Sequence, residues 1–237
     1  MRKFICVITI LCMCMCFSSL TAQNINSKAF FSCEVLAIGP EFVTGTIDNT
    51  LKPGIRVNLF TTHISSYKSP HFYSGIDFSI STHMFDPTVQ ERDIMDLYSV
   101  VTTTTSQFGT TQTSEPIEDI QISRMSVGIP IGYQGLNLDQ KISFLMNITP
   151  MYYSFGNSLQ GDDYDITDSG FGISFKIGFD YHWDKGMYLR LSYTHGSIPG
   201  FELPILEELR SISGPGTYGN LQIGLVLTTL ERDFLPQ

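Results

Sequence analysis

Residues 171–183, FGISFKIGFDYHW, decide the fold. Every odd position in this stretch is apolar or aromatic, seven in all, and every even position is a glycine, polar or charged residue. A period of two is typical of a β-strand with one apolar face, because successive side chains point to opposite sides. The thirteen residues exceed the about 5–6 of a common globular strand. The stretch therefore predicts an unusually long strand.

The same period recurs along the chain and predicts eight strands in total. Six more alternating stretches lie near residues 55–62, 76–84, 124–133, 142–149, 187–194 and 221–228. A first strand is expected near residues 31–42, where FFSCEVLAIGPEF alternates cleanly in neither register.

The connections between these strands alternate in length. In chain order they cover residues 43–53, 64–71, 86–119, 134–140, 156–169, 184–186 and 197–216. An up-and-down barrel places successive connections at opposite ends, and transmembrane barrels combine long extracellular loops with short periplasmic turns. We therefore expect an all-β fold, an eight-stranded antiparallel up-and-down transmembrane β-barrel. Ten strands are the alternative, since the threonine tract at 102–105 favours strand and would add a hairpin.

Composition agrees with a chain that does not face water everywhere. Charged residues make up 16%, against roughly 25% in ordinary soluble domains. The 42% of hydrophobic and 12% of aromatic residues exclude intrinsic disorder. A net charge of −9 without basic patches argues against a nucleic-acid partner. No apolar run after residue 23 approaches the length of a membrane-spanning helix.

The first 22 residues read as a secretory signal peptide. Arg2 and Lys3 precede an apolar run over residues 4–17, and Ala22 offers a small residue at the cleavage site, although Leu20 is large for its position. A membrane anchor is the alternative. The expected division is a signal peptide at 1–22 and a barrel domain at 23–237. Cleavage would leave Cys33 as the one cysteine, so no internal disulfide is expected.

The period alone does not tell which face meets lipid, because a soluble lipocalin-like barrel would place its apolar face inside. Small and charged residues on the polar face suit the narrow interior of an eight-stranded barrel. Aromatic residues near strand ends resemble the girdles at membrane interfaces. These are Phe85, Tyr133, Tyr152, Tyr153, Phe155, Tyr181, Trp183 and Tyr193. We therefore expect lipid on the apolar side.

Four segments carry a family resemblance: KPGIRVNLFTTHI, HFYSGIDFSIS, FGISFKIGFDYHW and MYLRLSYTHG. They resemble strands of the porin-like outer-membrane β-barrel domain family, the small OmpA-, OmpX- and OmpW-like barrels of Gram-negative bacteria. The resemblance covers nearly the whole mature chain and implies an outer-membrane location. Chains of that family often end on a strand that closes with an aromatic residue. This chain instead ends in ERDFLPQ, where Phe234 is the aromatic candidate.

Charged residues on the polar face are expected to lie inside the barrel and to pair with one another, since an unpaired charge in a poorly hydrated interior is costly. They are Arg56, Asp77, Arg124, Lys176, Asp180 and Arg190, with Glu34 as a further candidate. A salt-bridged plug is the favoured interpretation. A gated ion or proton path is the alternative.

Two other features suggest sites. His195-Gly196-Ser197 resembles the His-x-Ser of outer-membrane lipid A deacylases, but Ile198 stands where those enzymes usually have Asn. Four carboxylates at Asp162, Asp163, Asp165 and Asp168 lack the glycine and distal glutamate of an EF-hand loop, so a solvated loop is favoured over a metal site. No catalytic, cofactor-binding or metal-binding residue is assigned, and no cofactor is expected.

The 86–119 connection should contain a short helix. Asp86 and Pro87 fit the N-cap and first helical positions, and Ile94, Leu97, Tyr98 and Val101 follow at helical spacing. A second helix is expected from Pro204 to Leu209. Exposed Ile94, Leu97, Ile205 and Leu206 would form a partner surface or cap the barrel mouth.

The expected function is that of a structural or interaction scaffold in the outer membrane, with acidic extracellular loops and no enzymatic activity. Its partners would be outer-membrane lipid and an extracellular or membrane protein bound through the loops. A narrow solute channel is the first alternative, and a lipid-modifying enzyme is the second.

Overall fold

The structure is a computed structural model. It describes residues 29–45, 51–66, 69–97, 99–106, 109–116, 120–135, 142–159, 165–184, 187–198, 202–203, 212–213 and 215–228. The expected signal peptide, the expected helix from Pro204 to Leu209 and Phe234 lie outside these residues. The described part holds one helix, α2 (Val89–Leu97), which is too short to cross a membrane.

Antiparallel strands make up most of the described chain. They are β1 (Ala29–Gly45), β2 (Gly54–Ser66), β3 (Ser69–Ser74), β4 (Asp77–Met84), β5 (Ser99–Ser106), β6 (Gly109–Pro116), β7 (Ile120–Gly128), β8 (Ile131–Gly135), β9 (Ile142–Leu159), β10 (Asp165–Asp184), β11 (Met187–Ile198), β12 (Glu202–Leu203), β13 (Ile212–Ser213) and β14 (Gly216–Thr228).

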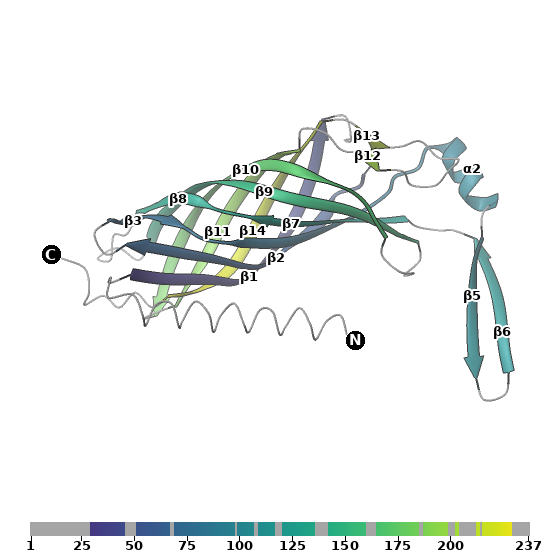
Figure 1. Ribbon diagram of the computed structural model, residues 1–237, viewed down its shortest axis with the longest axis horizontal. Helices are drawn as coiled ribbons and strands as arrows, with labels where there is room; N and C mark the ends of the chain where they lie inside the picture. Colours follow the sequence, from purple (N-terminus) through teal and green to yellow (C-terminus); the bar gives the residue numbers. More distant parts are fainter. Residues whose placement is uncertain are drawn as a thin grey trace.

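Eight of these strands close into a ring in the order β1, β2, β4, β7, β9, β10, β11 and β14, with β14 pairing back to β1 (Figure 1). β3 extends β4 along the same line of the barrel wall, and β8 extends β7 in the same way. β3 pairs with β2 on one side and with β8 on the other, and β8 pairs with β9 on its far side. The predicted eight-stranded barrel is confirmed. The threonine tract does form strand, but β5 and β6 pair only with each other, so the ten-strand alternative is wrong.

Two neighbouring strands are interrupted at the same place. β3 and β4 are separated by Gly75 and Ile76, and β7 and β8 by Ile129 and Pro130. Proline has no N–H to give to a ladder, so a strand tends to break where it occurs. The Gly75 amide donates to the Pro130 carbonyl at 3.1 Å, which bridges the two interruptions and keeps the barrel wall closed.

A β-bulge explains why the first strand alternates poorly. The register of β1 against β14 shifts between Glu34 and Leu36. Before the shift the even positions point inward, and after it the odd positions do, so Glu34, Ala37 and Glu41 are all fully buried. A bulge inserts one extra residue and re-aims the side chains that follow. The bulge therefore brings Glu34 and Glu41 to the same side of the wall.

The long strands shorten one expected loop. β9 and β10 extend through most of the 156–169 connection, which leaves residues 160–164 between them. That connection is therefore not long, and Asp165 and Asp168 belong to β10. The longest connections, between β4 and β7 and between β11 and β14, still open at one end of the barrel, which we call the loop end. The chain enters β1 and leaves β14 at the opposite end.

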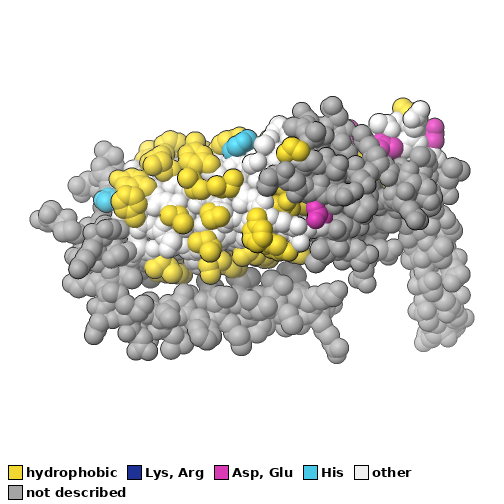
Figure 2. All heavy atoms as spheres, turned by 45° about the horizontal axis from the view of Figure 1, so that its top comes forward, with side chains coloured by type: hydrophobic (Ala, Val, Ile, Leu, Met, Phe, Trp, Pro, Cys, Tyr) yellow, Lys and Arg dark blue, Asp and Glu magenta, His cyan; other side chains and the backbone are white. Residues whose placement is uncertain are grey.

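Apolar side chains are spread over the barrel wall on the face that Figure 2 shows, and they form what we call the apolar belt. In β10 the outward side chains from Phe171 to Tyr181 are all apolar or aromatic, and their exposed fractions run from 36% to 75%. Ten residue steps at about 3.3 Å span about 33 Å along the strand. At the tilt of a transmembrane barrel this becomes about 25 Å of membrane thickness. The predicted lipid-facing side is confirmed, and the soluble alternative with its apolar face inside is wrong.

The expected aromatic girdle is only partly correct. Tyr152, Tyr181 and Tyr193 are exposed on the outer face. Phe85, Tyr153 and Phe155 are instead buried, with exposed fractions of 2%, 1% and 6%. β9 shows the reason: its inward positions are odd, so Tyr153 and Phe155 line the interior while Tyr152 points out. The side chain of Trp183 lies outside the described residues.

Helix α2 begins later than the sequence predicts. Thr88 is the N-cap, because its hydroxyl accepts the Glu91 amide at 3.4 Å and the Glu91 carboxylate accepts the Thr88 amide at 2.7 Å. This reciprocal pair is a capping box. Asp86 instead forms an exposed ion pair with Lys52 at 3.6 Å. The helix ends at Leu97 and Val101 lies in β5, whereas Tyr98 is outside the described residues.

The lipid-facing assignment predicts a position-dependent cost of charge on β10. Ile177→Arg should lower the free energy of unfolding by roughly 2–4 kcal/mol, because it places a cation near the bilayer midplane. Ser169→Arg is the matched control, since Ser169 is exposed on the same strand beyond the apolar belt. It should cost about 0–1 kcal/mol. Denaturant unfolding in lipid vesicles measures both. Equal losses for the two variants would contradict the assignment.

Candidate functional site

The barrel interior is polar and charged. Four carboxylates and four cations point into it, from six of the eight ring strands. They are Glu34, Glu41, Asp77, Asp180, Arg56, Arg124, Lys176 and Arg190. Seven of the eight are nine-tenths or more buried, and the Asp77 side chain is 13% exposed. The numbers of negative and positive groups are equal, so the interior balances its own charge without a ligand.

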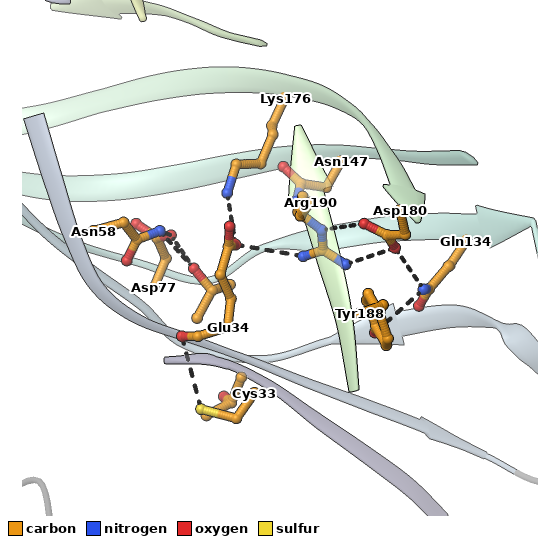
Figure 3. A network of polar contacts seen from close by, with 12 residues as sticks. Cys33, Glu34, Asn58, Asp77, Gln134, Asn147, Lys176, Asp180, Tyr188 and Arg190 are labelled. Atoms are coloured by element: carbon orange, nitrogen blue, oxygen red, sulfur yellow. Dashed lines mark hydrogen bonds and ion pairs between the residues drawn. The ribbon is translucent and has the colours of Figure 1, made fainter. Parts of the chain in front are cut away.

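Arg190 on β11 is the centre of the inner cluster, the group Glu34, Lys176, Asp180 and Arg190 (Figure 3). Its guanidinium donates to both oxygens of Asp180, from Nε at 2.7 Å and from Nη2 at 3.0 Å. Asp180 lies directly opposite on β10, in register with Arg190. Such a bidentate pair is a strong, geometrically specific interaction.

Glu34 completes the inner cluster from the other side of the barrel. Its Oε2 accepts the Lys176 ammonium at 3.0 Å and Arg190 Nη1 at 3.4 Å. Gly224 makes this approach feasible, because a Cβ at that position would lie 2.6 Å from Glu34 Oε1. The cluster thus connects β1, β10 and β11 across the interior.

Glu41 is the centre of a second group, the loop-end cluster, formed with Arg56, His83 and Arg124. Arg124 Nη2 donates to both Glu41 oxygens, at 2.9 and 2.8 Å. Arg56 Nη1 lies 3.5 Å from Glu41 Oε2, and His83 Nε2 lies 3.0 Å from Oε1. The ring of Tyr218 lies beneath Arg124, with 3.9 Å between the guanidinium carbon and the ring centroid. This cluster joins β1, β2, β4 and β7, and Tyr218 adds β14.

Arg56 and Asp77 extend the polar network from the loop-end cluster toward the middle of the barrel. Arg56 Nη2 lies 4.0 Å from Asp77 Oδ1. The other Asp77 oxygen accepts Asn58 Nδ2 at 2.9 Å and Thr61 Oγ1 at 2.7 Å. Each of the interior carboxylates therefore has more than one partner, as burial of charge requires.

The sequence predicts this site well but misses one central residue. All seven predicted interior charges, Glu34 included, lie inside and take part in ion pairs. Glu41 was missed, because a strict period of two places Glu34 and Glu41 on opposite faces. The broken alternation of FFSCEVLAIGPEF is the signal that marks the bulge. His83, which lies beside Glu41, is not among the predicted interior charges either.

A small polar cavity lies between the clusters. It has a volume of about 10 Å³, which is room for about one water molecule, and is lined by Arg56, Asn58, Asp77, Asn147, Thr149, Ser174, Lys176, Thr194 and Gln222. Asn58 Oδ1, Thr194 Oγ1 and Gln222 Nε2 have no hydrogen-bond partner among the described residues. Pockets for drug-sized ligands have volumes of about 300–1,000 Å³ and are mostly apolar. This cavity suits water molecules better than an organic ligand.

The His-x-Ser motif lies on the outer face of the barrel. His195 is exposed on β11, and Ser197 is on the same face two residues later. Their partners on the neighbouring strands are Phe175 and Gly219 for His195, and Ile173 and Thr217 for Ser197. A hydrolytic His–Ser pair needs a third group to orient the histidine. None of these four neighbours is a carboxylate.

The acidic stretch is divided by the structure. Asp165 and Asp168 lie in β10, whereas Asp162 and Asp163 lie outside the described residues. Asp168 Oδ1 accepts the backbone amide of Ser169 at 2.7 Å. Across the described ranges, no group of three potential metal ligands comes together.

The inner cluster predicts strong coupling between Asp180 and Arg190. Arg190→Met should destabilise the barrel by about 3–5 kcal/mol, because it leaves Asp180 buried without its bidentate partner. The double variant Asp180→Asn with Arg190→Met should lose much less than the sum of the two single variants, since Lys176 still pairs with Glu34. Urea unfolding in vesicles measures all three. Strictly additive losses would show that the two groups are not a functional pair.

Comparison with known proteins adds to the geometry. No protein-family model and no curated protein sequence matches the chain. Among solved structures, Neisserial surface protein A superimposes with a TM-score of 0.56 at 9% sequence identity, over 84% of this chain and 97% of that chain. The outer membrane protein OprG from Pseudomonas aeruginosa gives a TM-score of 0.47 at 9% identity, over 86% and 97%.

At this identity the likeness shows the fold, and the first of the two structures carries the argument. A closed ring of eight strands, an apolar exterior belt and a charge-paired interior occur together in this chain. With the fold that it shares with Neisserial surface protein A, they identify it as a small β-barrel of the outer-membrane type.

Proposed function

We propose that the protein is a non-conducting membrane scaffold that presents an interaction surface at its loop end. The observation that carries this proposal is the balanced filling of the interior, where four carboxylates and four cations pair across the barrel. Eight strands enclose a space that side chains just fill. The paired groups hold one another in place, which favours a structural role for the barrel itself.

The loop end offers the surface on which a partner would bind. Residues 85–119 contain seven carboxylates and one arginine. Asp86, Asp93 and Asp96 are exposed, and acidic side chains show at this end of the molecule (Figure 2). Glu91 is buried instead, because it caps α2. We infer an extracellular position for this end, since outer-membrane barrels carry their longer loops outside. The partner surface expected at Ile94 and Leu97 has its side chains outside the described residues.

A narrow solute channel is the second candidate. The polar cavity beside Arg56 and Lys176 favours it, because a conducting path needs polar space between the clusters. A lipid-modifying activity is not proposed, as no acid lies beside His195 and Ser197 in the two neighbouring strands.

Electrical measurement separates the scaffold from the channel. Protein reconstituted into planar bilayers should show conductance near the baseline of the lipid alone, because the paired charges occupy the lumen. Folded insertion is checked on the same sample by the different gel mobility of heated and unheated protein. Steady currents at the nanosiemens scale from folded protein would contradict the scaffold and favour the channel.

Labelling of intact cells tests the orientation of the loop end. Gln112→Cys in β6 should react with a membrane-impermeant maleimide added to whole cells. Lys185→Cys in the connection between β10 and β11 is the matched control at the opposite end, and it should react only after the outer membrane is permeabilised. Cys33 is buried and contributes little background. The reverse pattern would place the acidic loops in the periplasm and would contradict the proposed surface.

A further inference from the structure

His83 differs from the other members of the loop-end cluster, because histidine is the side chain that ordinarily changes its charge between about pH 5 and pH 8. It lies near the end of β4 and is 4% exposed. Its Nε2 lies 3.0 Å from Glu41 Oε1, and its Nδ1 lies 3.1 Å from the backbone carbonyl oxygen of Lys52. Lys52 belongs to the connection between β1 and β2. The imidazole therefore bridges the barrel wall and a loop-end connection.

Both contacts of His83 are made to groups that only accept hydrogen bonds. The Lys52 partner is a carbonyl oxygen, which has no proton to give. Glu41 is held as a carboxylate, because Arg124 Nη2 donates to both of its oxygens. A neutral imidazole has one N–H and one bare nitrogen, so it would satisfy one contact and turn a lone pair toward the other acceptor. Only the imidazolium, with two N–H groups, donates to both acceptors.

The chain beside His83 is tied to β4 by its backbone as well. The Lys52 amide donates to the Met84 carbonyl at 2.9 Å, so the residue that receives the imidazole contact also pairs with the next residue of β4. Gly54 leaves the space that the ring needs, since a Cβ at that position would lie 2.5 Å from His83 Nδ1 and would also meet the backbone of Thr82. The Lys52 amide is therefore a local reporter of the imidazole contact.

The charges that face His83 act in opposite directions, which leaves its proton removable. Glu41 on β1 favours the charged ring. Arg56 on β2 and Arg124 on β7 contact the same carboxylate, so their positive charges oppose a third one beside them. Arg56 shares its charge with a second carboxylate, since its Nη2 lies 4.0 Å from Asp77 Oδ1. The two arginines stay charged at every physiological pH, so the imidazole is the member of the cluster that can respond to pH.

The titratable groups of the other neighbouring elements add little net charge at the ring. Lys52 Nζ lies 3.6 Å from Asp86 Oδ1, so this exposed pair balances itself. Tyr218 on β14 is neutral, and its hydroxyl donates to Met151 Sδ at 3.5 Å. A protonated His83 adds one positive charge to the paired interior, and this charge lies at the end of the barrel that carries the acidic residues.

We propose that His83 is a proton-dependent latch that ties residues 51–53, at the end of the β1–β2 connection, to the barrel wall. The protonated ring donates to both Glu41 and the Lys52 carbonyl. Loss of one proton leaves a single N–H, which stays with the carboxylate because a charged acceptor gives the stronger hydrogen bond. The bare Nδ1 then faces the carbonyl oxygen, so the tie to Lys52 is present at mildly acidic pH and is lost as the pH rises. The latch would operate whatever partner the loop end binds, so it goes beyond the proposed function.

Hydrogen exchange of the Lys52 amide in lipid nanodiscs tests the latch. Its protection factor, corrected for the intrinsic effect of pH on exchange, should fall about tenfold between about pH 5.5 and pH 9, which corresponds to the loss of one charge-assisted hydrogen bond. His83→Gln should show equal protection at both pH values, because glutamine carries no titratable proton. His195→Gln is the matched control on the outer face and should behave as the wild type. The Ile129 amide, which donates to the Pro150 carbonyl at 3.0 Å elsewhere in the wall, should not respond.

Nitrogen NMR of the imidazole gives a second readout that needs no substitution. At about pH 5.5 both ring nitrogens of His83 should carry a proton, and at higher pH the proton on Nδ1 should be lost while Nε2–H remains. A singly protonated ring at the lower pH, Lys52 protection that is equal at both pH values, or an equal fall at Lys52 and Ile129 would each overturn the latch. Where His83→Gln does not fold, the ring nitrogens and the two amides of the wild type still decide.

Discussion

The Arg190 guanidinium is the contact on which the barrel interior depends. It holds Asp180 through two hydrogen bonds and reaches Glu34 with a third, and all three residues are fully buried. Removing one partner of a buried pair leaves an uncompensated charge and costs about 3–5 kcal/mol. Most proteins of this size rely on an apolar core for stability, whereas this barrel turns its apolar surface outward to lipid. Ion pairs across the lumen then replace the missing core.

The bulge in β1 makes this arrangement complete. Without it, Glu34 and Glu41 would point to opposite sides of the wall, and one carboxylate would meet the hydrocarbon of the membrane. Arg124 would then lose the carboxylate that accepts its two hydrogen bonds, and Arg56 would keep the more distant Asp77 as its one ion-pair partner among the described residues. One inserted residue thus supplies the second of two acidic centres, around which five strands meet.

The periodicity of the sequence predicts structural features that depend on one strand at a time. The faces of β10, β11 and β14 follow directly from their alternating sequences, because in a barrel wall one side is always lipid and the other always lumen. Features that depend on two strands, or on two residues that compete to cap a helix, are harder to predict from the sequence. The alternation over residues 124–133 predicts one unbroken strand, although Ile129 and Pro130 separate β7 from β8. Thr88 outcompetes Asp86 as N-cap because Glu91 can return the hydrogen bond. The inward rings of Tyr153 and Phe155 show that an aromatic residue near a strand end also serves as filling.

A sealed interior moves the question of function to the ends of the barrel. One end has connections of a few residues between most of its strands, which leaves little surface for recognition. The other carries α2, the acidic carboxylates and the neutral hairpin. The acidic carboxylates and the uncharged hairpin give this end two regions of different charge, so a partner would have to match both of them.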